Sequence, residues 1–170
     1  MATMLAKART KLVITHPFYA TIILSLNTVH TDKMPNGKDL WLLATNGIDL
    51  LVNDKNFEEL PIEHAVACLV HEAEPVARLH PFRRGHRNPA KWNSAGDYVI
   101  NDDMEKNREF QLPDGVLRNP AFRDMSTERV YNLLPDEQDN KGGDGDPLGD
   151  DVLDAPDCSD TAQTMTKELV

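Results

Sequence analysis

The most regular pattern of hydrophobic and polar positions lies between residues 62 and 73. Apolar residues recur there at spacings of three and four, the period of an α-helix with one buried face. These residues are Ile62, Ala65, Val66, Leu69, Val70 and Ala73. Pro61 stands where helices commonly begin, and Glu63 adds negative charge at the positive end of the helix dipole. The pattern predicts an amphipathic helix that begins near residue 62 and extends to Ala73.

Upstream of this helix, the chain predicts two helical pieces and then strands. Residues 2–27 are predicted to be helical, and His16-Pro17 divides them because the residue before a proline disfavours helical geometry. The predicted strands are 28–31, 40–45 and 48–52. Asn46-Gly47 is a strong two-residue hairpin signal between the last two of them.

Downstream, residues 91–104 predict a second amphipathic helix, and 111–122 are irregular. Ser126 can cap a final short helix that extends to Leu134. From residue 135 onward Asp, Gly and Pro dominate and helical periodicity is lost. The predicted organisation is one domain over residues 1–134, followed by an acidic linker or the start of a truncated region over 135–170.

The net charge of −10 is concentrated in one stretch. Residues 136–160 carry ten acidic residues and one lysine, a net charge of −9, which leaves −1 for the rest of the chain. Residues 139–146 loosely resemble a calcium loop, but they lack the acidic residue that closes such loops, so a solvated linker is the favoured interpretation. No basic stripe able to neutralise nucleic-acid phosphates is present. The charge pattern therefore argues against nucleic-acid binding.

The cysteines and the hydrophobic segments bear on the compartment. Cys68 lies in the predicted central helix and Cys158 in the acidic region, a distribution that suits a reducing environment better than a disulfide scaffold. No segment is long and apolar enough to cross a membrane. We therefore expect a cytoplasmic protein without a membrane partner.

The candidate chemistry lies at the end of the predicted central helix. His71-Glu72 is the opening of the H-E-x-x-H motif, in which two histidines one turn apart bind Zn²⁺ and the glutamate activates the metal-bound water. Position 75 holds a proline instead of the second histidine, and Pro75 can neither bind a metal nor donate a backbone hydrogen bond. Zinc is therefore expected to bind weakly or not at all.

Other donors on or near this helix could join His71. His64 and Cys68 share its helix face, since successive residues are about 100° apart. Glu74 lies three residues further on and would need the helix to tolerate the following proline. His80 can join only if the chain breaks near that proline and folds back, and a proline favours such a break.

Several short runs elsewhere carry a further signal. They are 15–20, 44–47, 70–72, His80, Arg83, Arg84, 92–101, 112–115 and 130–134. In their order and spacing they resemble a predicted metallopeptidase domain found in bacteria and phages. That family usually precedes a von Willebrand A-like domain and is often encoded near a MoxR-type AAA ATPase. The resemblance covers roughly residues 11–134.

This resemblance implies a zincin-like α+β fold, with helices packed on a small antiparallel sheet or hairpin. A helix carrying His71-Glu72 would face a second helix carrying the W-N-x-A-x-D run. His71 and Asp97 would then be zinc ligands and Glu72 the general base. The sequence departs from the family at Pro75, which replaces the second histidine.

Two functions from different classes are compatible with these residues. The first is a zinc-dependent peptidase or other hydrolase whose metal site is rebuilt from His71, His80 and Asp97, with Glu72 as general base. The second is a pseudoenzyme that keeps the scaffold as a protein-binding module. His71, Glu72 and Asp97 would then be buried polar residues that hydrogen-bond to one another or to their neighbours. Pro75 favours the second function.

The expected partners are proteins. The resemblance implies a AAA ATPase or a von Willebrand A-like domain as partner. The basic loop of Arg83, Arg84 and Arg87 is either a solvated connector or a docking point for the acidic region or an acidic partner.

Overall fold

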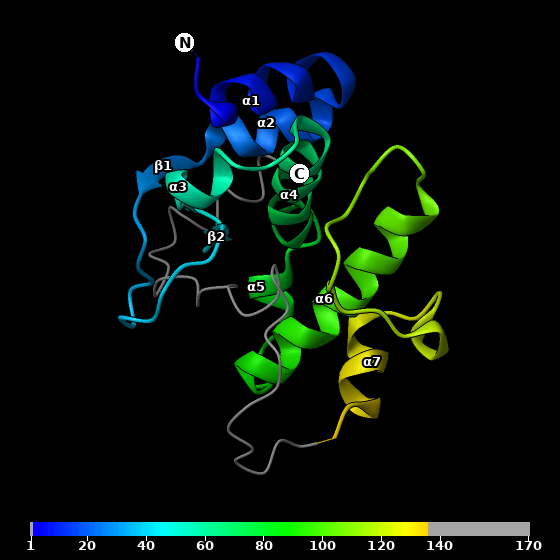
Figure 1. The fold of residues 1–170 in the computed structure, drawn as a ribbon. Coiled ribbons are helices and arrows are strands. Elements are labelled where there is room, and N and C mark those ends of the chain that lie inside the picture. The colour runs from blue at the N-terminus through cyan, green and yellow to red at the C-terminus, as the bar shows by residue number, and fades with distance from the viewer. Residues whose placement is uncertain (1, 136–170) are drawn as a thin grey trace.

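The structure is a computed structural model, and it describes residues 2–135. Within this range, seven α-helices pack with a small three-stranded sheet (Figure 1). The helices are α1 Met4–Thr15, α2 Pro17–Ser25, α3 Asp54–Phe57, α4 Ile62–Ala77, α5 His80–Arg83, α6 Pro89–Lys106 and α7 Thr127–Leu133, with a 3₁₀ turn at Pro120–Phe122. The strands are β1 Asn27–His30, β2 Leu43–Thr45 and β3 Asp49–Val52. The prediction of an α+β fold is confirmed.

The sheet has the strand order β1-β3-β2. β2 and β3 form the predicted antiparallel hairpin, whereas β1 runs parallel to β3. At the hairpin turn, Gly47 has a φ of 85° and the Asn46 side chain accepts hydrogen bonds from the backbone N–H groups of Ile48 and Asp49. This turn chemistry is what the Asn-Gly pair predicts. The sheet is mixed rather than purely antiparallel because β3 pairs with a parallel strand, β1, on one side and with an antiparallel strand, β2, on the other.

The break between α1 and α2 falls where the sequence places it. His16 has a φ of −139° and a ψ of 67°, outside the helical region, and Pro17 is the first residue of α2. The fixed φ of a proline suits the first turn of a helix but disfavours helical geometry in the preceding residue. The two-piece helix prediction is confirmed.

Helix α4 is the centre of the domain. It contacts α1, α2, β2, α5 and α6, and it lies under the α1–α2 pair in Figure 1. Every residue from Ala65 to Val76 is buried, including His71, Glu72 and Glu74. The helix is therefore covered on its polar side as well as on the apolar face that the sequence predicts.

The expected chain break near Pro75 is wrong. α4 continues through Pro75 to Ala77, and the Arg78 N–H donates to the Glu74 carbonyl at 2.9 Å. The helix is enclosed on all sides at this point, and we attribute its continuity to packing that outweighs the cost of one proline. The chain reverses instead at Leu79, whose φ of 54° is left-handed, and α5 begins at His80.

The second half of the domain is built on α6 and α7. Ala95 and Val99 of α6 pack against Val130 of α7 in a separate apolar cluster. The Ser126 hydroxyl accepts from the Arg129 N–H at 3.3 Å, so the predicted helix cap is confirmed.

Some sequence predictions concern residues outside the described range. These are the solvated-linker interpretation of 139–146 and most of the acidic unit predicted over 135–170. Within residues 2–135, no helix combines the length and apolar character needed to span a membrane.

Candidate functional site

His71 and Glu72 lie together in the buried middle of α4. The His71 side chain is 2% exposed, and its Nδ1 lies 3.8 Å from Oε1 of Glu72. Both side chains are surrounded by protein because the α1–α2 pair, β2 and α6 enclose α4. The arrangement places a titratable imidazole and a carboxylate next to each other away from solvent.

Asp97 comes to this pair from α6. Its Oδ1 lies 3.8 Å from Nε2 of His71, and its side chain is 2% exposed. Zinc binds nitrogen and oxygen donors at about 2.0–2.2 Å in tetrahedral geometry, so two donors of one ion lie about 3.4 Å apart. The separation of His71 and Asp97 is close to that distance and somewhat longer. The structure thus brings together two of the three predicted metal ligands.

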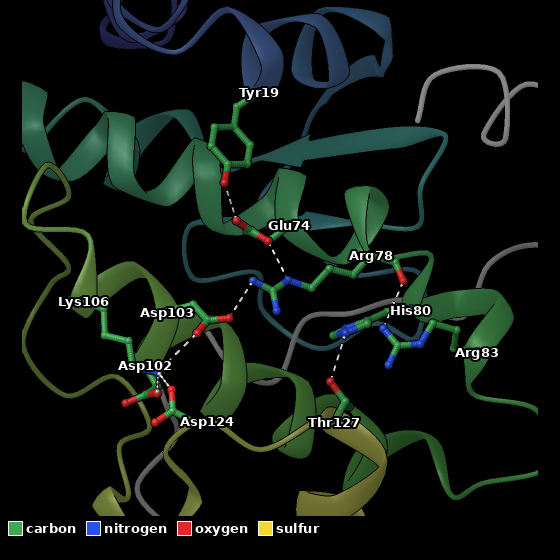
Figure 2. Close-up of polar contacts among 10 residues, drawn as sticks. All are labelled: Tyr19, Glu74, Arg78, His80, Arg83, Asp102, Asp103, Lys106, Asp124 and Thr127. Atoms are coloured by element: carbon green, nitrogen blue, oxygen red, sulfur yellow. Dashed lines mark hydrogen bonds and ion pairs between the residues drawn. The ribbon is translucent and has the colours of Figure 1, made fainter.

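His80, the third predicted ligand, is buried near the same cluster but has another contact. Its Nε2 lies 3.2 Å from the Thr127 hydroxyl of α7 (Figure 2). Its backbone carbonyl accepts a hydrogen bond from the indole N–H of Trp92 at 3.1 Å. The remaining edge of its ring rests against Gly96 of α6. His80 therefore links α5 to α6 and α7.

The environment of His80 opposes protonation. Burial, together with the positive charges of Arg83 and Arg78, lowers the pKa of His80 to about 3. An unfolded histidine has a pKa of about 6.5. The folded protein therefore holds His80 in its neutral form across the range in which an exposed histidine gains a proton.

We expect this histidine to make the domain less stable in acid. As the pH falls below about 6.5, the unfolded chain binds a proton that folded His80 excludes, so stability is lost between about pH 6.5 and 3, by about 2 kcal/mol at pH 5. Urea unfolding at about pH 7 and 5 measures the loss. His80→Asn is expected to flatten the dependence, and His86→Asn, on the exposed part of the same loop, is the matched control. If the free energy of unfolding depended on pH equally in the wild type and in His80→Asn, His80 would not be the source of the acid sensitivity.

Gly96 leaves room for the His80 ring. A Cβ at this position would lie 2.9 Å from Cε1 and 3.0 Å from Nδ1 of His80, closer than real contacts allow. The W-N-S-A-G-D run therefore places its smallest residue where α6 meets the imidazole. Only glycine fits without displacing the ring.

The effect of Gly96→Ala on the free energy of unfolding is expected to change sign when the His80 ring is removed. In the wild type, overpacking against His80 should exceed the helix propensity gained, for a net loss of about 1–2 kcal/mol. In a His80→Ala background the ring is gone, and the same substitution should stabilise by up to about 1 kcal/mol. Denaturant unfolding of the wild type, Gly96→Ala, His80→Ala and the double variant tests this. The same sign in both backgrounds would mean that the ring does not limit this position.

Glu74 is engaged in a different set of contacts. Its Oε1 accepts from the Tyr19 hydroxyl at 2.5 Å, and its Oε2 accepts from Nε of Arg78 at 2.6 Å. Arg78 also donates to Asp103 of α6 at 3.0 Å. Figure 2 shows this polar chain running from α2 across α4 to α6. Both oxygens of Glu74 are therefore committed to other residues.

The remaining candidate set on α4 does not assemble either. Cys68 is fully buried, and burial together with the negative charge of Glu72 raises the pKa of its thiol to about 12, whereas a zinc ligand must be a thiolate. His64, by contrast, is only partly buried, near the start of the helix.

Taken together, the donors do not fit a three-ligand zinc site. Among residues 2–135, no group of three or more His, Cys, Asp or Glu side chains is arranged to hold a metal ion. His71 and Asp97 are close enough to share one, Glu72 is beside them, and His80 contacts Thr127 instead. The missing donor corresponds to position 75, one helical turn after His71.

Comparison with known proteins assigns the chain to a family. A family model described as "Putative metallopeptidase domain" matches residues 1–166. The chain belongs to this metallopeptidase-domain family. No curated protein and no solved structure matches it. The family match extends past residue 134, where the sequence predicts a boundary, and that boundary stays a prediction.

The basic loop of this metallopeptidase domain is largely used inside the domain. Arg83 makes a bidentate ion pair with Glu128 at 2.7 and 2.8 Å. The Arg87 guanidinium lies over the rings of Trp92 and Tyr131, at 5.0 and 5.8 Å from their centroids. These contacts tie the loop to α6 and α7, which leaves it less free to dock a partner than its composition suggests.

Sequence reasoning missed the polar chain through Glu74. The spacing of Glu74 and Arg78 by four residues is a visible signal of an ion pair on one helix face. Tyr19 and Asp103 are 55 and 29 positions away from Glu74, and no local pattern links them to it. Only the packing of α2 and α6 against α4 brings them together.

Proposed function

We propose that this metallopeptidase domain is non-catalytic and acts as a protein-binding module. The observation that carries the proposal is Pro75, which occupies the second-ligand position inside the continuous helix α4. A site that lacks one strong donor binds zinc weakly, because affinity depends on a full set of preorganised ligands. Glu74 does not compensate, since both its oxygens are engaged with Tyr19 and Arg78.

The buried polar residues have a structural role under this proposal. His71 lies 3.8 Å from Glu72, also on α4, and 3.8 Å from Asp97 of α6, and His80 connects α5 to α7. Contacts of this length are longer than hydrogen bonds, so under this proposal they hold α4 and α6 in one register by packing and electrostatic attraction. The residues of the H-E motif would thus support the scaffold rather than turn over a substrate.

Exposed apolar side chains support a binding role. Four large hydrophobic residues of the α1–α2 pair are about half exposed or more, namely Val13 at 48%, Ile14 at 76%, Phe18 at 53% and Leu24 at 55%. A contiguous apolar patch is typical of a surface that another protein covers, and we infer that these four residues contribute to one. A cytoplasmic location is part of the proposal, since the buried Cys68 is a free thiol.

The second candidate function is a zinc-dependent hydrolase with a rebuilt site. It is favoured by the 3.8 Å separation of His71 and Asp97 and by the burial of His80 near them. His71, Asp97 and His80 would hold the ion, which would supply Lewis-acid chemistry, and Glu72 would serve as general base. His80 would first have to exchange its contact with Thr127.

Zinc analysis of the purified protein separates the two functions. We expect no stoichiometric zinc by elemental analysis, unchanged thermal unfolding in chelator, and no hydrolysis of peptide substrates. His71→Ala is the control, and its zinc content should equal that of the wild type. About one zinc per chain that disappears in His71→Ala would overturn the proposal and establish the rebuilt site.

A further inference from the structure

A groove runs along the outer face of α1, away from the H-E motif. Its volume is about 390 Å³, and Ala6, Thr10 and Ile14 contribute to its lining. These three residues follow one another at intervals of four, so they form a single stripe along the helix. Ile14 is the most exposed large hydrophobic residue among residues 2–135. The groove is therefore a surface with an apolar floor.

The same surface is positively charged. α1 contains Lys7, Arg9 and Lys11 and no acidic residue. Lys7 and Lys11 line the groove beside the apolar stripe. Lys11 is paired with Glu63, whereas within residues 2–135 Lys7 has no acidic partner. A segment that combines apolar side chains with carboxylates would complement this groove.

The groove continues toward the start of α2. A second hollow of about 400 Å³ shares Lys11 and Thr15 with it and extends to His16, Glu63 and Glu109, so the positive charge is confined to the α1 part of the surface. The total surface is longer than a single side chain requires.

This chain itself contains a segment of the complementary kind. Residues 147–157, Pro-Leu-Gly-Asp-Asp-Val-Leu-Asp-Ala-Pro-Asp, hold the large aliphatic side chains of the acidic region, namely Leu148, Val152 and Leu153. Four aspartates surround them, at positions 150, 151, 154 and 157.

The connection is long enough to reach. α7 ends at the opposite end of the domain from α1 in Figure 1. A domain of this size has a radius of gyration of about 14 Å, so its diameter is about 36 Å. The twelve residues from 136 to 147 span up to about 40 Å when extended. A path along the surface to the opposite end covers about half a circumference, about 57 Å for this diameter. Val152 and Leu153 lie up to about 58 Å along the extended chain from residue 136, so these two side chains can reach the groove.

We propose that segment 147–157 docks into the α1 groove of the same chain, with its aliphatic side chains on the Ala6–Ile14 stripe and its aspartates beside Lys7 and Lys11. The contact covers part of the apolar α1–α2 surface. A protein partner for that surface must then displace the segment. The inference rests on the groove and its charge, so it stands or falls independently of whether zinc binds.

A spin label at Cys158 tests the contact in the full chain. Cys68 is fully buried, so the label is directed to Cys158, which is next to the proposed docking segment in the sequence. With isotope-labelled protein, a nitroxide on Cys158 is expected to broaden the backbone amide signals of Ala6, Thr10 and Ile14. Amide signals of α7, at the opposite end of the domain in Figure 1, should keep their intensity.

Variants on both sides of the contact provide the controls. Ile14→Asp in the groove and the double change Val152→Asp with Leu153→Asp in the segment should each restore the α1 signals. Val29→Asp changes another exposed β-branched residue, on β1, and should leave the broadening as in the wild type. Circular dichroism of each variant verifies that the domain is folded.

Mixing distinguishes contact within one chain from contact between chains. Isotope-labelled Cys158→Ser protein is combined with spin-labelled, unlabelled wild type. We expect no broadening of α1 in the mixture, because the contact is intramolecular. Broadening that appears in the mixture would assign the groove to a second copy and overturn the proposal. Absence of broadening in the singly labelled chain, or broadening that survives Ile14→Asp, would overturn it as well.

Discussion

Replacement of Pro75 by histidine is expected to turn this domain into a zinc-binding protein. α4 is continuous from Ile62 to Ala77, so residue 75 lies one turn after His71 and on the same face. Asp97 already lies 3.8 Å from His71. A histidine at position 75 would add the third donor of an H-E-x-x-H site, and the substitution also removes a residue unfavourable inside a helix.

The measurement is zinc stoichiometry together with thermal or denaturant unfolding. At a zinc concentration about one hundred times the dissociation constant, binding should raise the free energy of unfolding of Pro75→His by about 2.7 kcal/mol. Pro75→Ala separates the two effects of the change, since it restores the helix without supplying a ligand and should gain no zinc. Zinc uptake should vanish in Pro75→His combined with His71→Ala or Asp97→Ala.

A failure of Pro75→His to bind zinc would be equally informative. It would mean that His71 and Asp97 are not positioned as metal ligands, even though the chain belongs to the metallopeptidase-domain family. His71 and Glu72 would then serve only as packing residues in this chain. Zinc uptake by Pro75→Ala would instead show that the proline constrains donors already present.

Replacement of Glu74 by alanine is expected to be the most destabilising single change in the polar chain, by about 3 kcal/mol. Glu74 is buried and joins Tyr19 of α2 to Arg78 at the end of α4. Its removal leaves the Arg78 guanidinium and the Tyr19 hydroxyl without their buried acceptor, and breaking such a pair costs more than its formation contributes. The lost free energy should appear as a shift in the midpoint of urea unfolding.

A second glutamate on the same helix is the matched control. Glu63 also makes an ion pair, with Lys11, but both side chains are more than a third exposed. Glu63→Ala should therefore cost at most about 1 kcal/mol. A loss at Glu74 no larger than the loss at Glu63 would show that the polar chain does not contribute to the stability of the domain.

Much of the fold was predictable from local sequence. The break at His16-Pro17, the hairpin at Asn46-Gly47 and the cap at Ser126 were each predicted and are each present. These signals are reliable because they depend on residues only a few positions apart. Proline fixes its own φ, glycine permits a left-handed turn, and a serine hydroxyl reaches the N–H groups three residues on.

The sequence also marked the residues of the candidate site before their arrangement was known. His71, Glu72 and Asp97 were predicted to lie together. In the structure the His71 ring lies 3.8 Å from the carboxylate of Glu72 and 3.8 Å from that of Asp97. The prediction for His80 needed the chain to fold back near Pro75. The reversal occurs at Leu79 instead, and His80 contacts Thr127.

The sequence by itself thus determined where α1 and α2 are divided, where α7 is capped, where the hairpin turns, and which side chains could carry chemistry. Tertiary structure alone decided that α4 continues through Pro75, that β1 runs parallel to β3, and that Glu74 joins Tyr19 to Arg78. The reason is physical. Each of these outcomes is set by the free energy of packing between segments distant in the chain, which outweighs a local preference of a few kcal/mol and leaves no local trace in the sequence.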